Sequence, residues 1–269
     1  MVARRERTPP SQLEGYVLHR WDWSESSLVL DLFTRERGRL AVVAKGAKRP
    51  TSQLRAVLLP FQRVQATLAR TAADEQGEIQ VLRHAEWAGG GALLPAAALF
   101  QGFYLNELLL RLLARADPHA ALFDAYTATL PALAHGDEQI AQAGLRAFEL
   151  VLLRETGVLP DLAITTLGQQ AVQPGGRYAL RPESGLVAQA DGGGVAGALW
   201  LALQGALDEG SAVALQRACL AHLAPLKGML RQLLHYHLGS QRLHTREVMH
   251  SVQRLVDRST PAAQDASTR

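Results

Sequence analysis

The sequence contains a single cysteine, Cys219, among 269 residues. One thiol cannot form a disulfide within the chain, and it cannot build a zinc site out of cysteines. Cys219 lies among apolar residues at helical spacing, where a small buried core residue is the expected role. The sequence therefore points away from disulfide-rich secreted proteins and from proteins that hold zinc with cysteines.

Long apolar runs are also missing. No stretch of about 18 apolar residues is uninterrupted, so we expect no membrane-spanning helix. Residues 1–12 begin with basic side chains but are not followed by the apolar segment of a secretory signal. We expect these residues to be a flexible N-terminus. The resulting prediction is a cytoplasmic protein without a membrane partner.

Familiar catalytic motifs are absent as well. The sequence has no Walker-A lysine, no G-x-S-x-G and no H-E-x-x-H. Its closest histidine pair, His235 and His237, diverges by about 200° on a helix and cannot share an ion. We therefore predict no catalytic residue, no metal site and no cofactor. A nuclease or ligase-like enzyme stays an alternative, because distant residues can assemble a catalytic pair.

The charges divide the chain into three parts. Residues 1–55 carry a net charge of +5, residues 56–216 carry −7, and residues 217–258 carry +5. Two basic ends around an acidic middle suggest that a polyanion contacts the ends, and that a protein partner contacts another part of the chain.

The first third of the chain has the period-two pattern of β-strands. The predicted strands lie near Tyr16–Leu18, Ser27–Phe33, Arg39–Lys45, Phe61–Arg70 and Glu78–Trp87. Five short strands with a longer connection between the third and the fourth favour an OB-type barrel. An SH3-like barrel would give nearly the same pattern.

Helical periodicity follows the barrel pattern and is interrupted once. Pro95, Asp117, Asp137 and Ser211 are predicted to begin helices, and Gly157 to end one. The overall prediction is an α+β chain in which an OB-fold domain precedes a mainly helical domain with an inserted loop and hairpin lobe. The predicted ranges are 13–88 for the OB-fold domain, 92–157 and 198–258 for the two parts of the helical domain, 158–197 for the lobe, and 259–269 for a disordered tail.

Seven cations and one acid lie between residues 35 and 55. These candidate DNA-binding residues are Arg35, Arg37, Arg39, Lys45, Lys48, Arg49 and Arg55. Strand alternation places Arg39 and Lys45 on one face, from which they could neutralise phosphates and release counterions. The alternative is a solvated hairpin whose charges only keep it soluble.

Two further groups could add to this surface. Trp21 and Trp23 lie near a strand end and are the best candidates for stacking on bases, although most aromatic residues of this part are expected to fill the barrel. Arg242, Arg246 and Arg254 form a second basic group, which is a further candidate for DNA contact.

Three stretches, taken together, resemble the RecO recombination mediator proteins of bacteria. The first combines GYVL (15–18), ESSL (25–28), LFTRERGRL (32–40) and VAKGAK (43–48). The second combines YLNELLLRLL (104–113), DPH (117–119) and LF (122–123). The third is R-x-F-E (146–149) with Leu152, Leu153 and Gly157. Their order and spacing carry the resemblance over about residues 13–160.

The resemblance implies an OB-fold domain and a helical domain, into which many members insert a four-cysteine zinc module. This chain has no cysteine between residues 158 and 197, so its lobe must be stable without zinc. The resemblance further implies binding of single- and double-stranded DNA, annealing of complementary strands, and a nucleoid-associated location. A general OB-fold RNA-binding factor is the alternative.

The resemblance also implies protein partners. The family acts on strands coated by single-stranded-DNA-binding protein (SSB) and, with RecR, loads the RecA recombinase. For the acidic C-terminal tail of SSB, the candidate residues are Arg111, Arg146 and Arg154, because each lies beside a leucine stripe. The same arginines could instead pair with neighbouring glutamates of their own helices.

Overall fold

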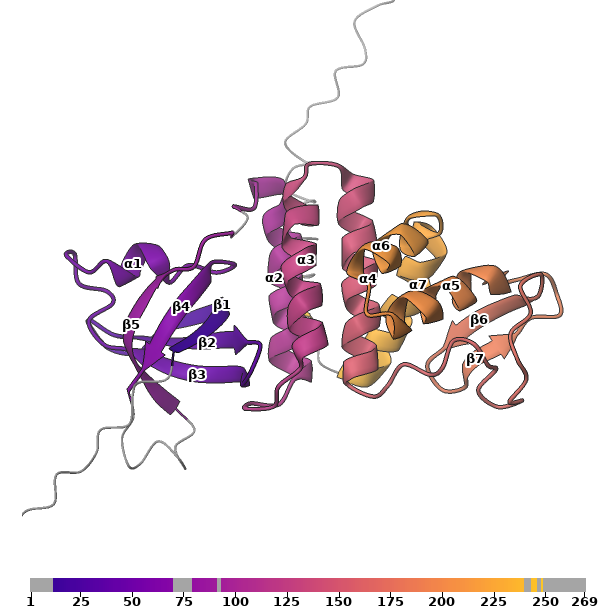
Figure 1. Cartoon of the computed structure of the whole chain (residues 1–269), viewed down its shortest axis with the longest axis horizontal. Coiled ribbons are helices and arrows are strands. Elements are labelled where there is room, and N and C mark those ends of the chain that lie inside the picture. Colours follow the sequence, from indigo (N-terminus) through magenta and orange to yellow (C-terminus); the bar gives the residue numbers. More distant parts are fainter. Residues whose placement is uncertain (1–11, 70–78, 91–92, 240–242, 246–247, 249–269) are drawn as a thin grey trace, which may run out of the picture.

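A computed structural model describes residues 12–69, 79–90, 93–239, 243–245 and 248. Figure 1 shows three parts in a row: a β-barrel, a group of helices, and a small hairpin lobe at the end opposite the barrel. The predictions of a flexible N-terminus at 1–12 and of a disordered tail at 259–269 fall outside the described residues, except for Gln12, which begins the first strand. None of the helices in the described part is long and apolar enough to cross a membrane.

The N-terminal part is a closed five-stranded barrel with the strand order β1-β2-β3-β5-β4. The strands are β1 (Gln12–Asp22), β2 (Leu28–Thr34), β3 (Gly38–Ala44), β4 (Arg63–Leu68) and β5 (Ile79–Trp87). β3 and β5 pair in parallel, and the other neighbours pair antiparallel. This order is that of an OB-fold, so the predicted barrel and its five strands are confirmed. A one-turn helix after β3, α1 (Leu54–Val57), was not predicted.

The period-two pattern sorts the strand residues between two apolar clusters. Leu30, Leu32, Leu40 and Val42 fill the barrel interior with little or no exposure. Residues of the opposite parity, such as Phe33, instead join the core of the helical part. One outer face of the barrel is therefore covered by helices.

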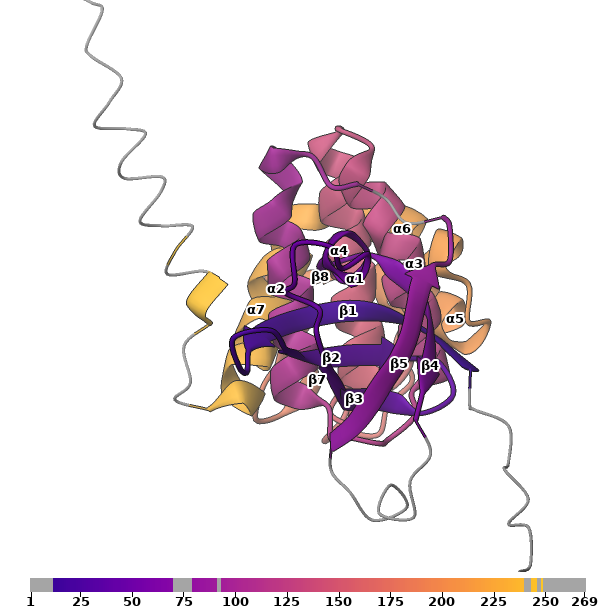
Figure 2. The same cartoon turned by 90° about the vertical axis from the view of Figure 1, so that its left-hand side faces the viewer.

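The helices that the structure describes in full after the barrel form one apolar core. They are α2 (Ala96–Leu112), α3 (Ala120–Ala134), α4 (Glu138–Glu155), α5 (Gly197–Asp208), α6 (Ala212–Leu220) and α7 (Leu223–Leu238). Figure 1 shows α2 and α3 next to the barrel, and α4 between this pair and the group of α5, α6 and α7. Figure 2, which looks onto the barrel, shows the helices behind the strands. The helical domain predicted after the barrel is present.

Local chemistry explains several helix ends. The side chain of Asp137 accepts hydrogen bonds from the N–H groups of Gln139 and Ile140, at 2.8 and 3.2 Å, as predicted for an N-cap. Ser211 accepts from the N–H of Ala214 at 3.2 Å. Gly157 has a φ of 73°, the left-handed conformation that ends α4 after Glu155.

Two predicted helix starts need correction. Pro95 is the N-cap of α2 rather than its first helical residue. Asp117 does not cap α3, which begins at Ala120 with His119 at the N-cap. The reason is tertiary: the backbone of Asp117 packs against Gly38, where an added Cβ would lie 1.9 Å from the Asp117 carbonyl oxygen. That contact holds the residue outside the helix.

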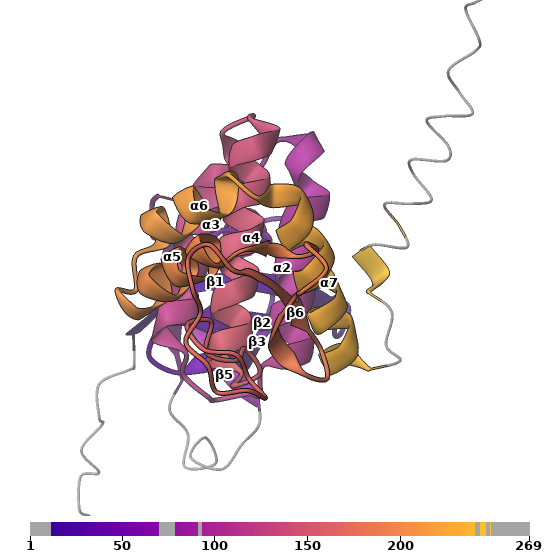
Figure 3. The same cartoon turned by 90° about the vertical axis from the view of Figure 1, so that its right-hand side faces the viewer.

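The inserted lobe contains the predicted hairpin, now seen as β6 (Arg177–Arg181) and β7 (Gly185–Ala188), with a third short strand, β8 (Val195–Ala196). Figure 3 views the molecule from this end. Hydrogen bonds hold the lobe together, and Tyr178, Leu180 and Leu186 belong to the apolar core of the helical part. The N–H of Thr166 donates a hydrogen bond to the carbonyl of Leu186 at 2.9 Å, and the N–H of Leu186 donates one to the Thr166 hydroxyl at 2.9 Å. The hydroxyl of Tyr178 accepts from the N–H of Gln173 at 2.9 Å, which ties the hairpin to the preceding loop.

Candidate nucleic-acid interface

The seven cations predicted to bind DNA lie at two ends of the barrel. We call the first group, Arg35, Arg37 and Arg39, the helix-side end, because it belongs to the β2–β3 turn and the start of β3 beside α2 and α3. We call the second group the distal end; it comprises Lys45, Lys48, Arg49 and Arg55 after β3, together with Trp21 near the end of β1 and Trp23 just after it. Figure 1 shows α1 and its neighbouring loops on the side of the barrel away from α2 and α3.

Strand register orders the outer face between these two ends. Tyr16, Phe33 and Arg39 form one cross-strand row, and the row of Trp21, Val29 and Val43 lies further toward the distal end. Tyr16 and Phe33 are 1% and 0% exposed and contact Phe123 and Tyr126 of α3 through tilted and edge-on ring pairs. Trp21, by contrast, is 41% exposed. The helices thus cover one half of this face and leave the other half to solvent.

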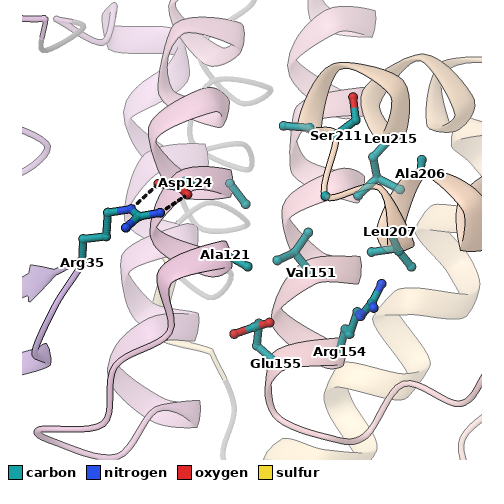
Figure 4. Close-up of a pocket in the computed structure, with 13 residues that line it drawn as sticks. Arg35, Ala121, Asp124, Val151, Arg154, Glu155, Ala206, Leu207, Ser211 and Leu215 are labelled. Carbon is teal, nitrogen blue, oxygen red and sulfur yellow. Dashed lines mark hydrogen bonds and ion pairs between the residues drawn. The ribbon is translucent and has the colours of Figure 1, made fainter.

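At the helix-side end, Arg35 and Arg39 hold the barrel to the helical part, whereas Arg37 donates to the side-chain oxygen of Gln80 in β5 at 3.2 Å. Arg35 makes a bidentate pair with Asp124 of α3, with both N–O distances at 2.9 Å. Figure 4 shows this pair at the edge of a cavity of about 370 Å³, with Val151, Leu207 and Leu215 among its apolar lining residues. The Arg35 guanidinium is therefore turned toward α3.

Arg39 is held more firmly still. It donates to the carbonyl of Leu113 at 3.0 Å and lies 3.5 Å from the carboxylate of Asp31, which is 1% exposed. Arg115 approaches the same carboxylate at 3.9 Å. Burial raises the pKa of Asp31 despite the attraction of the arginines, and burial also lowers the pKa of Arg39. Desolvation is the dominant influence on both groups, as is common for a buried ion pair.

Other contacts fix this junction without charge. A β-bulge in β1 shifts the register between Val17 and His19, and the carbonyl of the intervening Leu18 accepts a hydrogen bond from the Asn106 amide at 2.7 Å. The Tyr126 hydroxyl donates to the same Asn106 side chain at 2.6 Å. Burial raises the pKa of Tyr126 well above its usual value, so this hydroxyl stays a neutral donor.

The distal end has different surroundings. Lys45, Arg49 and Arg55 are exposed and form no ion pair among the residues that the structure describes. Gly46 adopts a φ of 71°, which permits the turn after β3, and the side chain of Arg49 lies over this glycine. These three cations are available to an anionic ligand.

Lys48 brings the two distal loops together. Its N–H donates to the carbonyl of Ser26 at 3.0 Å, and its ammonium donates to the carbonyl of Ser24 at 3.0 Å and lies 3.4 Å from Asp22. These contacts place the turn that carries Trp23, which is 65% exposed, beside the cationic turn after β3. In OB-folds, the face of strands 2 and 3 and the loop between strands 1 and 2 commonly bind oligonucleotides.

The arginines predicted for the SSB tail do not share one site. Arg111 lies 2.7 Å from Glu107, and Arg146 lies 2.9 Å from Glu149 in a pair that is almost fully buried. Arg154 pairs with Asp208 of α5 at 3.1 Å and not with a glutamate of its own helix. Arg242, Arg246 and Arg254 lie outside the described residues.

A groove of about 240 Å³ does combine cations with apolar groups on the helical part. α2, α4, α7 and Thr245 line it. Its aromatic and aliphatic members include Phe100, Tyr104 and Leu145. Its charged members are the cations Arg146, Lys227 and Arg231 and one acid, Glu138.

The sequence argument overlooked Lys227 and Arg231. They are one turn apart on α7 and both exposed, whereas Leu226 and Leu230 of the same helix are buried. A pair of cations at i and i+4 beside a leucine stripe is a pattern that can be seen in the sequence. What the sequence could not show is that α2 and α4 approach this face of α7.

The fold and the interface define the class: an OB-fold barrel joined to a helical domain, with an exposed aromatic and cationic end of the kind that suits nucleic acids. Comparison with known protein families identifies the chain further. The models described as "Recombination protein O N terminal" and "Recombination protein O C terminal" match residues 10–90 and 96–247. The chain belongs to the RecO family of DNA repair and recombination proteins.

Individual proteins with sequences similar to this chain indicate the same family. The DNA repair protein RecO of Albidiferax ferrireducens is 50% identical over 244 residues, which cover 90% of this chain and 95% of that protein. The protein of the same name from Verminephrobacter eiseniae is 51% identical over 246 residues, covering 90% of this chain and 96% of that protein. That of Acidovorax ebreus is 48% identical over 271 residues, covering 95% and 100%.

Proposed function

We propose that this chain binds single- and double-stranded DNA through the distal end of its barrel. The observation that carries the proposal is the association of Lys45, Arg49 and Arg55, which have no ion pair in the described part, with the exposed rings of Trp21 and Trp23. Phosphates would be neutralised by the cations, and unpaired bases would stack on the indoles. Contacts of this kind carry little sequence information.

Binding of this kind suits strand annealing. Two complementary strands repel each other through their phosphates, and a protein that neutralises part of that charge lets them approach. The role we propose is therefore that of a recombination mediator that anneals strands without catalysing a covalent step. With RecR, the chain would promote loading of RecA, as the family resemblance implies.

We further propose that the groove between α2, α4 and α7 binds the acidic tail of SSB. An acidic peptide with apolar side chains needs cations beside apolar walls, and Lys227 and Arg231 next to Phe100 and Leu145 supply both. Of the three arginines predicted from the sequence, only Arg146 lines this groove. Arg111 and Arg154 therefore drop out of the proposed tail site.

Annealing of SSB-coated complementary oligonucleotides tests the whole proposal. We expect the chain to accelerate annealing of coated strands, and we expect Lys227→Ala combined with Arg231→Ala to remove the acceleration on coated strands while sparing it on bare ones. Equal loss on coated and bare strands would place the two cations in DNA binding instead. Titrations with single-stranded DNA, duplex DNA and RNA over a salt series address the alternative of an RNA-binding factor.

A further inference from the structure

A short segment after α7 is attached to the face of α2. Leu243 is 9% exposed and belongs to the apolar core of the helical part. The carboxylate of Glu107 accepts hydrogen bonds from the N–H groups of His244 and Thr245, at 2.8 and 3.0 Å, and from the Thr245 hydroxyl at 2.6 Å. One carboxylate thus holds the backbone and a side chain of a segment more than 130 residues away in the sequence.

Glu107 is well placed to hold this segment. Its side chain is 12% exposed, and Arg111 lies 2.7 Å from it on the next turn of α2. Burial alone would raise the pKa of Glu107, but the hydrogen bonds from Thr245 and His244 and the charge of Arg111 bring it below its usual value. The carboxylate is therefore ionised at neutral pH, and the attachment weakens only as the pH falls through this lowered pKa.

The attached segment forms part of the groove proposed above for the SSB tail. Thr245 lines that groove together with Tyr104, which lies one turn before Glu107 on α2. Lys227 and Arg231 of α7 line the same groove. Detaching the segment from Glu107 would remove one lining residue and widen the groove at that place.

We propose that Glu107 is a positioning residue, which holds His244 and Thr245 as one wall of the groove, and that an acidic peptide in the groove and the attached segment stabilise each other. The coupling rests on the proposed tail site, whereas the role of Glu107 in holding the segment does not. If the peptide binds better when the wall is in place, thermodynamic linkage requires that the bound peptide also favour the attached state.

Amide hydrogen exchange of the full chain tests both parts. Exchange at the N–H groups of His244 and Thr245 is measured with and without a synthetic peptide that carries the acidic C-terminal tail of SSB. The variants are Glu107→Gln, which removes the charge at constant size, and Thr245→Val, which removes only the hydroxyl. Glu183→Gln, on an exposed residue of the lobe, is the matched control.

In the unaltered chain, we expect slow exchange at both amides and still slower exchange with the peptide. Glu107→Gln should speed exchange by roughly tenfold, in line with loss of a charge-assisted hydrogen bond, and should weaken peptide binding by roughly fivefold. Thr245→Val should produce smaller changes in the same direction, and Glu183→Gln none.

The possible failures are distinguishable. Exchange that is equally slow in Glu107→Gln would overturn the positioning role, whatever the peptide does. Exchange that depends on Glu107 but not on bound peptide would overturn the coupling. A peptide that does not bind the unaltered chain would overturn the coupling and the proposed tail site together, while the exchange of the free chain still decides the role of Glu107.

Discussion

The two ends of the barrel have a similar density of cationic residues and different surroundings. The helix-side end has three arginines within five residues, and the distal end has three cations within five residues. At the helix-side end, Arg35 and Arg39 are joined to α3 and to the end of α2. At the distal end, Lys45, Arg49 and Arg55 face solvent beside two exposed tryptophans. Density of positive charge alone therefore does not identify a nucleic-acid surface. The cations must also be exposed to solvent and not engaged by the helical part.

The largest expected effect comes from Arg39→Met, and it is an effect on stability. This change leaves Asp31 buried with Arg115, 3.9 Å away, as its remaining arginine partner in the described part of the chain. Removing one partner of a buried pair typically costs about 3 kcal/mol or more, so the free energy of unfolding should fall by roughly that amount. Denaturant titration measures it.

The pH dependence sharpens this prediction. The pKa of Asp31 is already raised by burial, and loss of Arg39 should raise it further. The cost of the lone carboxylate is present above that pKa and is relieved as the pH falls through it, because the folded state takes up the proton. The stability deficit of Arg39→Met should therefore shrink in mild acid, and Asp31→Asn in the same chain should remove this pH dependence.

The second effect concerns affinity. Changing Lys45, Arg49 and Arg55 to Ala together should weaken single-stranded DNA binding by roughly 30-fold near physiological salt, since each phosphate contact contributes through counterion release. These side chains are exposed, so the melting temperature should stay close to that of the unaltered chain. Fluorescence anisotropy and thermal melting measure the two quantities. A large drop in melting temperature with unchanged affinity would reverse the roles that we assign to the two ends.

A third, smaller effect is expected from Trp23→Ala. Loss of one stacking ring commonly costs ~1–3 kcal/mol on single strands, and less is expected on duplex DNA, whose bases are already stacked. Trp87, which is 60% exposed and pairs with Val64 on β4, offers a matched control. Equal losses for Trp23→Ala and Trp87→Ala would show that the stacking surface is not confined to the distal end.

The smallest effect is expected from Arg35→Ala. Its pair with Asp124 is exposed on both sides, with side chains 49% and 57% accessible, and exposed pairs contribute little to stability. DNA affinity should be unchanged, because this guanidinium is directed at α3. A loss of affinity equal to that of Arg49→Ala would extend the DNA surface to the helix-side end.

The sequence predicted the barrel well, because period-two alternation reports which residues fill an interior. Leu40 and Val42 were assigned to the interior side of β3 correctly in this way, whereas Lys45, predicted on the opposite side of the strand, lies in the turn after β3. Asp137, Ser211 and Gly157 were also correct, because capping depends on residues within one turn of the chain.

Contacts between segments far apart in the sequence could not be predicted from these local patterns. Nothing near Arg39 in the sequence indicates that the carbonyl of Leu113 will meet it, and nothing near Asp117 indicates that Gly38 will hold it outside α3. The groove that contains Lys227 and Arg231 requires the packing of three helices, which a single helical pattern cannot reveal.

The most direct test compares the salt dependence of single-stranded DNA binding for two variants that each lose two charges, Lys45→Ala/Arg49→Ala and Arg35→Ala/Arg37→Ala. At about 0.7 units of log–log slope for each phosphate contact, the distal variant should flatten the slope by roughly 1.4 units. The helix-side variant should keep the slope of the unaltered chain. A flattened slope in the helix-side variant, with an unchanged slope in the distal one, would contradict the account.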